Sequence, residues 1–191
     1  MEQLLRVAQA EALVVTPGAA ADLGELARDV AAFLGPMAVR AHRTVEVEAP
    51  DAPVMVRGQT DALFHAVRNV VDNALRHTPP GTAVVLRVET APPSLSVSDG
   101  GPGIPPEHRK LVFQRFWRAE RRGGGSGLGL AIVQRTMAAH GGRVIVEDAE
   151  GGGARFRLVF PDRSPDVSMI ADAVLGIRSK LRGGPGRSGW L

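Results

Sequence analysis

Residues 60–76 read TDALFHAVRNVVDNALR and carry the strongest helical pattern in the chain. Apolar side chains recur there every three or four residues, which places them along one face of a helix. The members of this stripe are Leu63, Phe64, Val67, Val70, Val71 and Leu75. Asn69 and Asn73 are one helical turn apart, so their amides project from the same side. The stretch predicts a core helix that also presents polar groups.

Short strand-like segments lie on both sides of this helix, and Pro79-Pro-Gly81 ends it. The predicted strands are residues 44–48, 53–56, 83–89, 95–98, 143–147 and 155–160. They do not alternate regularly with helices. We therefore expect an α+β fold: a two-layer α/β sandwich whose mixed, mostly antiparallel sheet is covered on one face by about three helices.

Two further helices flank the central one in the sequence. Asp22 is the predicted N-cap of the first, and Pro36 is expected to bend or end it. The second runs from about Leu128 to His140, and Gly141-Gly142 is expected to end it with a left-handed cap.

Composition excludes several classes of protein. The 191 residues contain no cysteine, which excludes disulfides and thiolate metal sites, and the net charge is only +3. Nucleic-acid binding lacks support because the few aromatic residues are not interleaved with basic ones. No apolar run reaches the roughly 18–20 residues needed to cross a bilayer, and Glu2 and Arg6 interrupt any signal peptide. We expect a soluble, cytoplasmic chain.

Asp99-Gly-Gly-Pro-Gly103 follows the end of an apolar strand. A carboxylate there can accept a hydrogen bond from an exocyclic amine such as that of adenine, and glycine permits close approach of the backbone to a ligand. An ordinary Asp-Gly turn is the alternative.

The glycine-rich run from Gly123 to Gly129 leads directly into the predicted last helix. Backbone amides at a helix N-terminus bind phosphate, although this run is neither a Walker A loop nor a dinucleotide fingerprint. A flexible linker is the alternative. The adjacent basic run, Arg118 to Arg122, is equally consistent with a solvated loop and with phosphate attraction. Phe113 and Phe116, in the preceding segment, are expected to anchor that segment to the body, a role that overlaps with core packing.

Asn69 and Asn73 are also open to two interpretations. An amide oxygen is a hard ligand suited to Mg²⁺, which bridges substrate phosphates, and Arg76 lies one turn further on for a phosphate. Two surface asparagines near a helix end are the alternative.

Taken in order, these stretches resemble the N, G1, F and G2 boxes of the ATP-binding catalytic domain of sensor histidine kinases. That domain belongs to the group that includes DNA gyrase, Hsp90, MutL and the anti-sigma-factor serine kinases. The resemblance covers about residues 40–161 and implies an α/β sandwich, ATP as the nucleotide and Mg²⁺ as the metal.

The resemblance implies a role for each matching residue. Asn73 would hold Mg²⁺ with Asn69 beside it, and both would be catalytic together with Arg76. Asp99 would accept a hydrogen bond from the adenine amino group, helped by Gly101 and Gly103. Phe116 would steady the lid, which is the segment that also carries Arg115 and Arg118. The remaining implied ATP-binding residues are His77, Ile104, Arg115, Arg118, Gly125, Gly127, Leu128, Gly129 and Leu130.

One position separates the hydrolysing members of the group from the kinases. The hydrolases carry a glutamate base one turn before the metal-binding asparagine, and Asn69 stands there in this chain. An amide cannot take a proton from water, so the resemblance implies transfer of the γ-phosphoryl group to a protein acceptor.

Two features depart from the family pattern. Gly153-Ala154 stands where a threonine often joins the adenine network, and no histidine is followed by a carboxylate as in the acceptor motif. Residues 1–18 would be the end of a dimerisation-type helix plus a linker, and 19–161 the ATP-binding domain. Residues 162–191 would be a tail with a short amphipathic helix and then a disordered end, and a frayed tail without a role is the alternative. The expected partners are a histidine-containing dimerisation domain, upstream or on another chain, and indirectly a response regulator. Any membrane contact would come through an upstream region.

Three functions are consistent with these features. The first is the catalytic domain of a two-component sensor histidine kinase. The second is a nucleotide-binding regulatory module without kinase activity, and the third is an anti-sigma-factor-type serine kinase.

Overall fold

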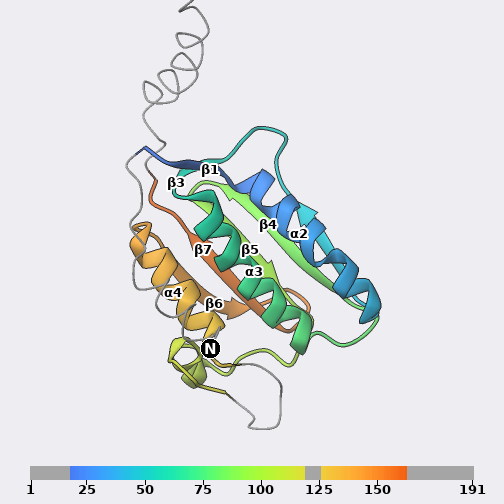
Figure 1. Cartoon of the computed structure of the whole chain (residues 1–191). Coiled ribbons are helices and arrows are strands. Elements are labelled where there is room, and N and C mark those ends of the chain that lie inside the picture. The colour runs from blue at the N-terminus through green and yellow to red at the C-terminus, as the bar shows by residue number, and fades with distance from the viewer. Residues whose placement is uncertain (1–17, 119–125, 163–191) are drawn as a thin grey trace, which may run out of the picture.

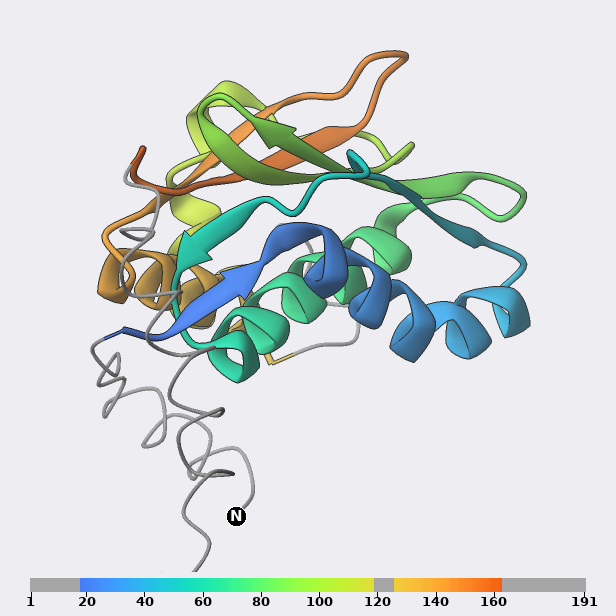
Figure 2. The ribbon, with the colours of Figure 1, turned by 90° about the horizontal axis from the view of Figure 1, so that it is seen from above.

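A five-stranded sheet with helices packed on one face forms the body of the protein, as Figures 1 and 2 show. The computed structural model describes residues 18–118 and 126–162. The strands, in their order across the sheet, are β2 (Thr44–Glu48), β4 (Ala83–Thr90), β5 (Pro93–Ser98), β7 (Ala154–Val159) and β6 (Arg143–Asp148). The β2–β4 pair is parallel and the other pairs are antiparallel, which confirms the predicted α+β class.

The helices that cover the sheet are α2 (Leu23–Arg40), α3 (Thr60–His77) and α4 (Gly129–Ala139). The central helix α3 lies between the other two (Figure 1). Two 3₁₀ turns, η1 (Pro106–His108) and η2 (Leu111–Phe113), follow the sheet hairpin of β4 and β5. The prediction for residues 60–76 is thus confirmed to within one residue.

A separate two-stranded sheet, β1 (Ala20–Asp22) with β3 (Met55–Arg57), lies beside the start of α2. The sequence did not predict β1, because three residues give no alternation to recognise. The strand predicted at residues 53–56 is displaced by two residues at its start, because its pairing with β1 begins at Met55.

The prediction at the start of α2 is confirmed, and of the two outcomes expected at Pro36 an end of the helix does not occur. The Asp22 carboxylate accepts a hydrogen bond from the Gly24 N–H at 2.9 Å and caps the helix. The helix then continues through Pro36 to Arg40. Pro36 and Ala32, whose carbonyl loses its intrahelical donor, are both exposed, so water can satisfy that carbonyl.

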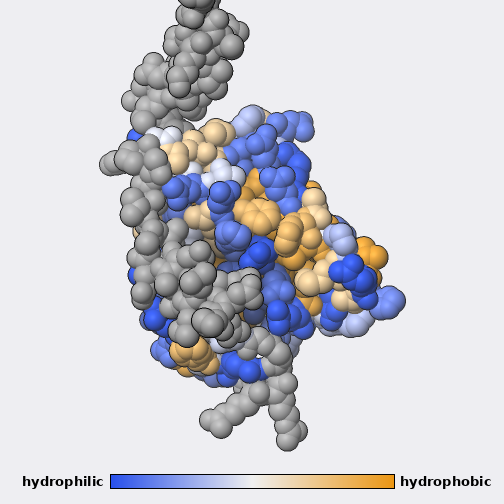
Figure 3. All heavy atoms as spheres, in the orientation of Figure 1, coloured by the Kyte–Doolittle hydropathy of each residue, from blue (hydrophilic) through white to orange (hydrophobic). Residues whose placement is uncertain are grey.

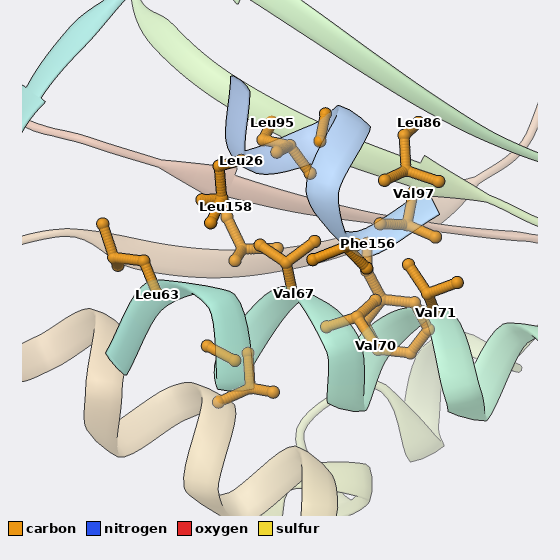
Figure 4. Close-up of a cluster of buried hydrophobic side chains, with 14 of the residues drawn as sticks. Leu26, Leu63, Val67, Val70, Val71, Leu86, Leu95, Val97, Phe156 and Leu158 are labelled. Atoms are coloured by element: carbon orange, nitrogen blue, oxygen red, sulfur yellow. The ribbon is translucent and has the colours of Figure 1, made fainter. Parts of the chain in front are cut away.

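The hydrophobic core fills the space between the sheet and α3, as Figure 4 shows. Alternate residues of β4 point into it, because successive side chains of a strand face opposite sides. The labelled strand residues are Leu86, Leu95, Val97, Phe156 and Leu158, and they meet Leu63, Val67, Val70 and Val71 of α3. All nine are no more than 1 % exposed, so this stripe is what fixes α3 on the sheet.

The opposite face of the sheet is polar and carries a charge network. Glu89 pairs with Arg155 at 2.9 Å and with Arg157 at 2.7 Å, and it accepts a hydrogen bond from the Ser94 hydroxyl. Burial alone would raise the pKa of Glu89, but the hydroxyl and the two guanidinium groups outweigh burial and lower that pKa. Ion pairs therefore link the strands on this face, and the helices pack on the other one.

The helix layer itself carries exposed apolar surface (Figure 3). Phe33, Met37 and Val39 of α2 are exposed, and the Phe33 ring meets the Phe64 ring edge-on at 5.7 Å. In the described part of the chain, none of the helices combines the length and apolar content needed to cross a bilayer. Residues 1–17 and 163–191, which carry the predicted terminal helices, lie outside the described residues.

Candidate nucleotide site

Asp99 comes directly after β5 and is 6 % exposed. Its Oδ1 atom accepts hydrogen bonds from the Gly101 N–H at 2.8 Å and from the Ala154 N–H at 3.2 Å. Among the described residues, no group bonds to its Oδ2 atom. One carboxylate oxygen therefore fixes the backbone, and the other remains an acceptor for a ligand.

The glycines around Asp99 allow the backbone to pack closely. A Cβ atom on Gly101 would lie 2.8 Å from the His77 carbonyl oxygen at the end of α3. Gly153 has a φ of +90°, and a Cβ atom there would lie 1.9 Å from the Asp99 carbonyl oxygen. A Cβ atom on Gly103, whose φ is +76°, would lie 3.3 Å from the Gly153 carbonyl oxygen. We call Asp99, residues 100–104 and Gly153 the carboxylate end of the site.

The two asparagines lie further back along α3, both half-buried. A Cβ atom on Gly129, the first residue of α4, would lie 3.8 Å from the Asn69 Cβ atom. The first turn of α4 therefore starts against the part of α3 that carries the amides. Within the described residues, neither amide is hydrogen-bonded to another residue. We call Asn69, Asn73 and the start of α4 the amide end.

The N-terminus of α4 has no side-chain cap. Leu128 precedes it and is buried, and Leu130 packs against the core, so the first turn is held by its apolar side chains. Its free N–H groups are suited to bind an anion, because unsatisfied amides and the helix dipole both favour negative charge.

Arg76 and His77, at the end of α3, are both exposed. The Arg76 guanidinium bonds the Asp72 carboxylate one turn earlier, with Nη2 to Oδ2 at 2.8 Å and Nε to Oδ2 at 3.2 Å. The His77 backbone carbonyl lies against Gly101 of the carboxylate end.

The segment after η2 differs from prediction in one respect. Phe113 is 8 % exposed and meets the Phe156 ring edge-on at 6.4 Å, so it anchors the segment to the core as predicted. Phe116 is 71 % exposed, so the prediction that its side chain also anchors the segment is wrong. Its backbone adopts a φ of +65° and its N–H bonds the Gly127 carbonyl oxygen at 2.9 Å, which holds the segment through the main chain instead.

Gly127 is required at this contact, because a Cβ atom there would lie 2.8 Å from the Phe116 Cα atom. Arg115 and Arg118 are exposed on the same segment. Gly125, with the rest of residues 119–125, lies outside the described residues. Ile104, the last residue of the 100–104 segment, packs against the core.

Sequence reasoning missed two residues at the site. Gly153 was noted only as part of a departure from the family pattern, although a Cβ atom there would approach Asp99 more closely than one on any other described glycine approaches its neighbours. Arg109 bonds the Ile104 carbonyl oxygen at 3.0 Å and was not singled out. Three glycines in a row were a signal for Gly153, but nothing local marks Arg109.

A family model described as "Histidine kinase-, DNA gyrase B-, and HSP90-like ATPase" matches residues 58–164, more than half of the chain. The chain belongs to this family. The match begins just before α3 and ends just after β7, so it includes both ends of the site.

Among similar proteins are the histidine-protein kinase/phosphatase MprB of Mycolicibacterium paratuberculosis and two solved kinases. MprB is 41 % identical over 134 residues, which is 65 % of this chain and 26 % of MprB. A solved mycobacterial sensor histidine kinase MprB has a TM-score of 0.65 and 36 % identity, covering 74 % of this chain and 95 % of that one. Full-length ShkA in complex with AMPPNP has a TM-score of 0.69 and 29 % identity, covering 84 % of this chain and 34 % of that one.

The chain spans about a quarter of the length of the curated relatives that it matches. The similarity is therefore to one part of those kinases. Its fold is that of their ATP-binding catalytic domain.

Proposed function

We propose that this chain is the ATP-binding catalytic domain of a two-component sensor histidine kinase, and that it transfers the ATP γ-phosphoryl group to a histidine on a dimerisation domain. The proposed domain is residues 19–161, with a dimerisation-type helix end and linker at 1–18 and a tail at 162–191. The observation that carries this proposal is the buried Asp99, whose Oδ1 is used by the backbone while its Oδ2 remains an acceptor.

The carboxylate end suits adenine. Its amino group would donate to Oδ2, and the backbone at Gly101 and Gly103 would approach the ring closely because no side chain intervenes. If the adenine binds there, the phosphates of the nucleotide would extend along α3 toward the asparagines and the uncapped first turn of α4. Family membership and the AMPPNP complex of the similar kinase ShkA support ATP as the nucleotide.

The amide end suits Mg²⁺ held partly by the nucleotide. The described residues contain no cluster of three or more His, Cys, Asp or Glu side chains able to hold a metal. Mg²⁺ commonly takes one or two protein oxygens and completes its shell with phosphates and water, and the unbonded amide of Asn73 supplies such an oxygen. When bound there, the ion would neutralise charge on the β- and γ-phosphates.

The proposed reaction is a transfer to histidine. A ring nitrogen of the acceptor attacks the γ-phosphorus, the bond to the bridging oxygen breaks, and ADP leaves. Asn69 lies beside the phosphate path but cannot deprotonate water, so the site has no general base there for hydrolysis. Arg115 and Arg118 are exposed on the segment after η2, from which they would approach the γ-phosphate.

The test is transfer of labelled γ-phosphate from ATP to a dimerisation domain. The full chain is mixed with Mg²⁺, ATP and the purified dimerisation domain of a similar kinase such as MprB. We expect an acid-labile, base-stable phosphate on that domain, and none with Asn73→Ala. Acid-stable phosphate on the partner would instead favour a serine kinase.

Binding without transfer is measured separately. If the chain binds ATP but labels no supplied histidine domain, the regulatory-module alternative is supported and the kinase assignment is contradicted. If it does not bind ATP in the presence of Mg²⁺, the nucleotide site itself is contradicted.

A further inference from the structure

Arg109 lies between the carboxylate end and the hairpin of β6 and β7. Its Nε–H donates to the Ile104 carbonyl oxygen at 3.0 Å, and its Nη2 pairs with the Asp148 carboxylate at the end of β6. The Arg109 side chain is only 24 % exposed. Its Asp148 partner is 76 % exposed, so the hydrogen bond to the Ile104 carbonyl is the better shielded of the two, and a charged donor makes a stronger hydrogen bond than a neutral one.

Both ends of residues 99–104 are thereby tied to one cross-strand pair. Asp99 is bonded to Ala154 twice, from its N–H to the Ala154 carbonyl at 2.9 Å and from the Ala154 N–H to its Oδ1 atom. Asp148 is the direct partner of Ala154 in the β6–β7 ladder. The contacts therefore form a closed ring that runs from Asp99 to Ile104, Arg109, Asp148, Ala154 and back to Asp99.

This ring compensates for a flexible sequence. Residues 99–104 contain three glycines and a proline, and glycine loses more conformational freedom on ordering than other residues. A segment of this composition keeps one shape only when both ends are fixed. The family resemblance accounts for the anchor at Asp99, whereas the second anchor is Arg109.

We propose that Arg109 is a positioning residue for adenine recognition, because it closes the ring of contacts that fixes both ends of residues 99–104. This inference rests on the proposed nucleotide function. Arg109 does not touch the nucleotide. It acts through the Ile104 carbonyl and Asp148, and it therefore sets affinity for the base without changing the phosphate end.

The test compares nucleotides that differ at one end only. Binding of ADP, AMPPNP and GDP to the full chain is measured for the unchanged protein and for Arg109→Met, which keeps the apolar stem and removes the donors. We expect ADP and AMPPNP to bind about fivefold more weakly and GDP to be unaffected, so that the preference for ADP over GDP falls by the same factor. A purely structural role would lower the thermal midpoint and leave this preference unchanged.

Three further variants make the result specific. Lys110→Met removes an exposed neighbouring charge and is expected to bind ADP normally. Arg109→Lys keeps the charge but reaches one acceptor at a time, so it should fold and show an intermediate loss. Combining Asp148→Asn with Arg109→Met should weaken ADP binding no further than Arg109→Met alone, because both changes open the same ring.

The outcomes separate this inference from the function on which it rests. If the unchanged chain binds ADP and both Arg109 variants bind it equally well, or if they lose ADP and GDP by the same factor, Arg109 has no positioning role. If the unchanged chain binds none of the nucleotides, the proposed function fails and this inference fails with it.

Discussion

At the carboxylate end of the site, Asp99 is 6 % exposed and its backbone partners are already in place, whereas at the amide end Asn69 and Asn73 are half-buried and unbonded among the described residues. The carboxylate end is held by hydrogen bonds to Gly101 and Ala154 and by close glycine contacts. The amide end has a helix start without a side-chain cap.

The difference indicates that the two ends have different roles in the proposed site. A preformed acceptor can select the base at little cost in ordering, because the protein has already fixed its geometry. In the proposed site, the open amides and free N–H groups would acquire their full set of partners only when the nucleotide phosphates and Mg²⁺ bind. We therefore expect changes at the carboxylate end to alter affinity for the base, and changes at the amide end to alter transfer and the effect of Mg²⁺ on nucleotide affinity.

The largest expected effect is on transfer. Asn73→Ala removes the amide oxygen proposed for Mg²⁺, and we expect the transfer rate to fall by about a thousandfold, near the upper end of losses seen when one group that stabilises transition-state charge is removed. ADP binding without Mg²⁺ should change little, because the adenine contacts are untouched. Single-turnover transfer and calorimetric ADP binding measure the two quantities. Equal losses in both would remove the distinction between the ends.

The second effect is on affinity. In Asp99→Asn, the remaining oxygen can still accept from Gly101 and Ala154, while the new NH₂ group faces the adenine amine with a donor. We expect ADP affinity to fall about 100-fold, because a charge-assisted hydrogen bond is replaced by two opposed donors. The thermal midpoint serves as the control and should change little. Retained ADP affinity would show that Asp99 does not read the base.

The third effect is on stability. It is measured by comparing the same substitution at two glycines with nearly equal φ. Gly153 has φ of +90° and its Cβ would collide with the Asp99 carbonyl, whereas Gly151 has φ of +86° and open space around it. We expect Gly153→Ala to lower the free energy of unfolding by about 2–4 kcal/mol and to weaken ADP binding. Gly151→Ala should cost only about 1–2 kcal/mol and leave binding unchanged. Denaturant unfolding compares them, and equal costs would mean that the Asp99 contact is unimportant.

The smallest effect lies outside the site, on the polar face of the sheet. The pKa of Glu89 is lowered from 4.5, so its contribution to stability is complete above that value and is lost as pH falls through the lower pKa of the folded state. We expect Glu89→Gln to cost about 1 kcal/mol at pH 7, and the cost to shrink below pH 4.5. ADP affinity should not change. A cost that persists at low pH would show that Glu89 acts through packing and not through its charge.

Much of the fold could be predicted because its signals are local. The apolar stripe of α3, the alternation in β2 and the left-handed Gly141 after α4 each follow from short-range patterns. The sequence could not tell whether α2 ends at Pro36, because the cost of proline in a helix depends on whether the freed carbonyl is exposed, and exposure is a tertiary property. The strand β1 exists only through its pairing with β3.

The site could be predicted in outline for a different reason. Asparagines on one helix face, a carboxylate before glycines and a glycine-rich helix start carry chemistry that residue type alone reveals. Contacts between segments far apart in the sequence do not. Gly153 is 54 residues from Asp99, and Arg109 is 39 residues from Asp148, so neither contact has a local signature. The outward turn of Phe116 likewise follows from its positive φ, which its side chain does not suggest.

The most direct test is the effect of Mg²⁺ on AMPPNP affinity, measured by calorimetry on the full chain and on Asn73→Ala. We predict that Mg²⁺ strengthens AMPPNP binding to the unchanged chain by about tenfold and has almost no effect on the variant, while both bind ADP alike without metal. An equal Mg²⁺ effect in the two proteins, or no AMPPNP binding to the unchanged chain, would contradict a nucleotide site with separate carboxylate and amide ends.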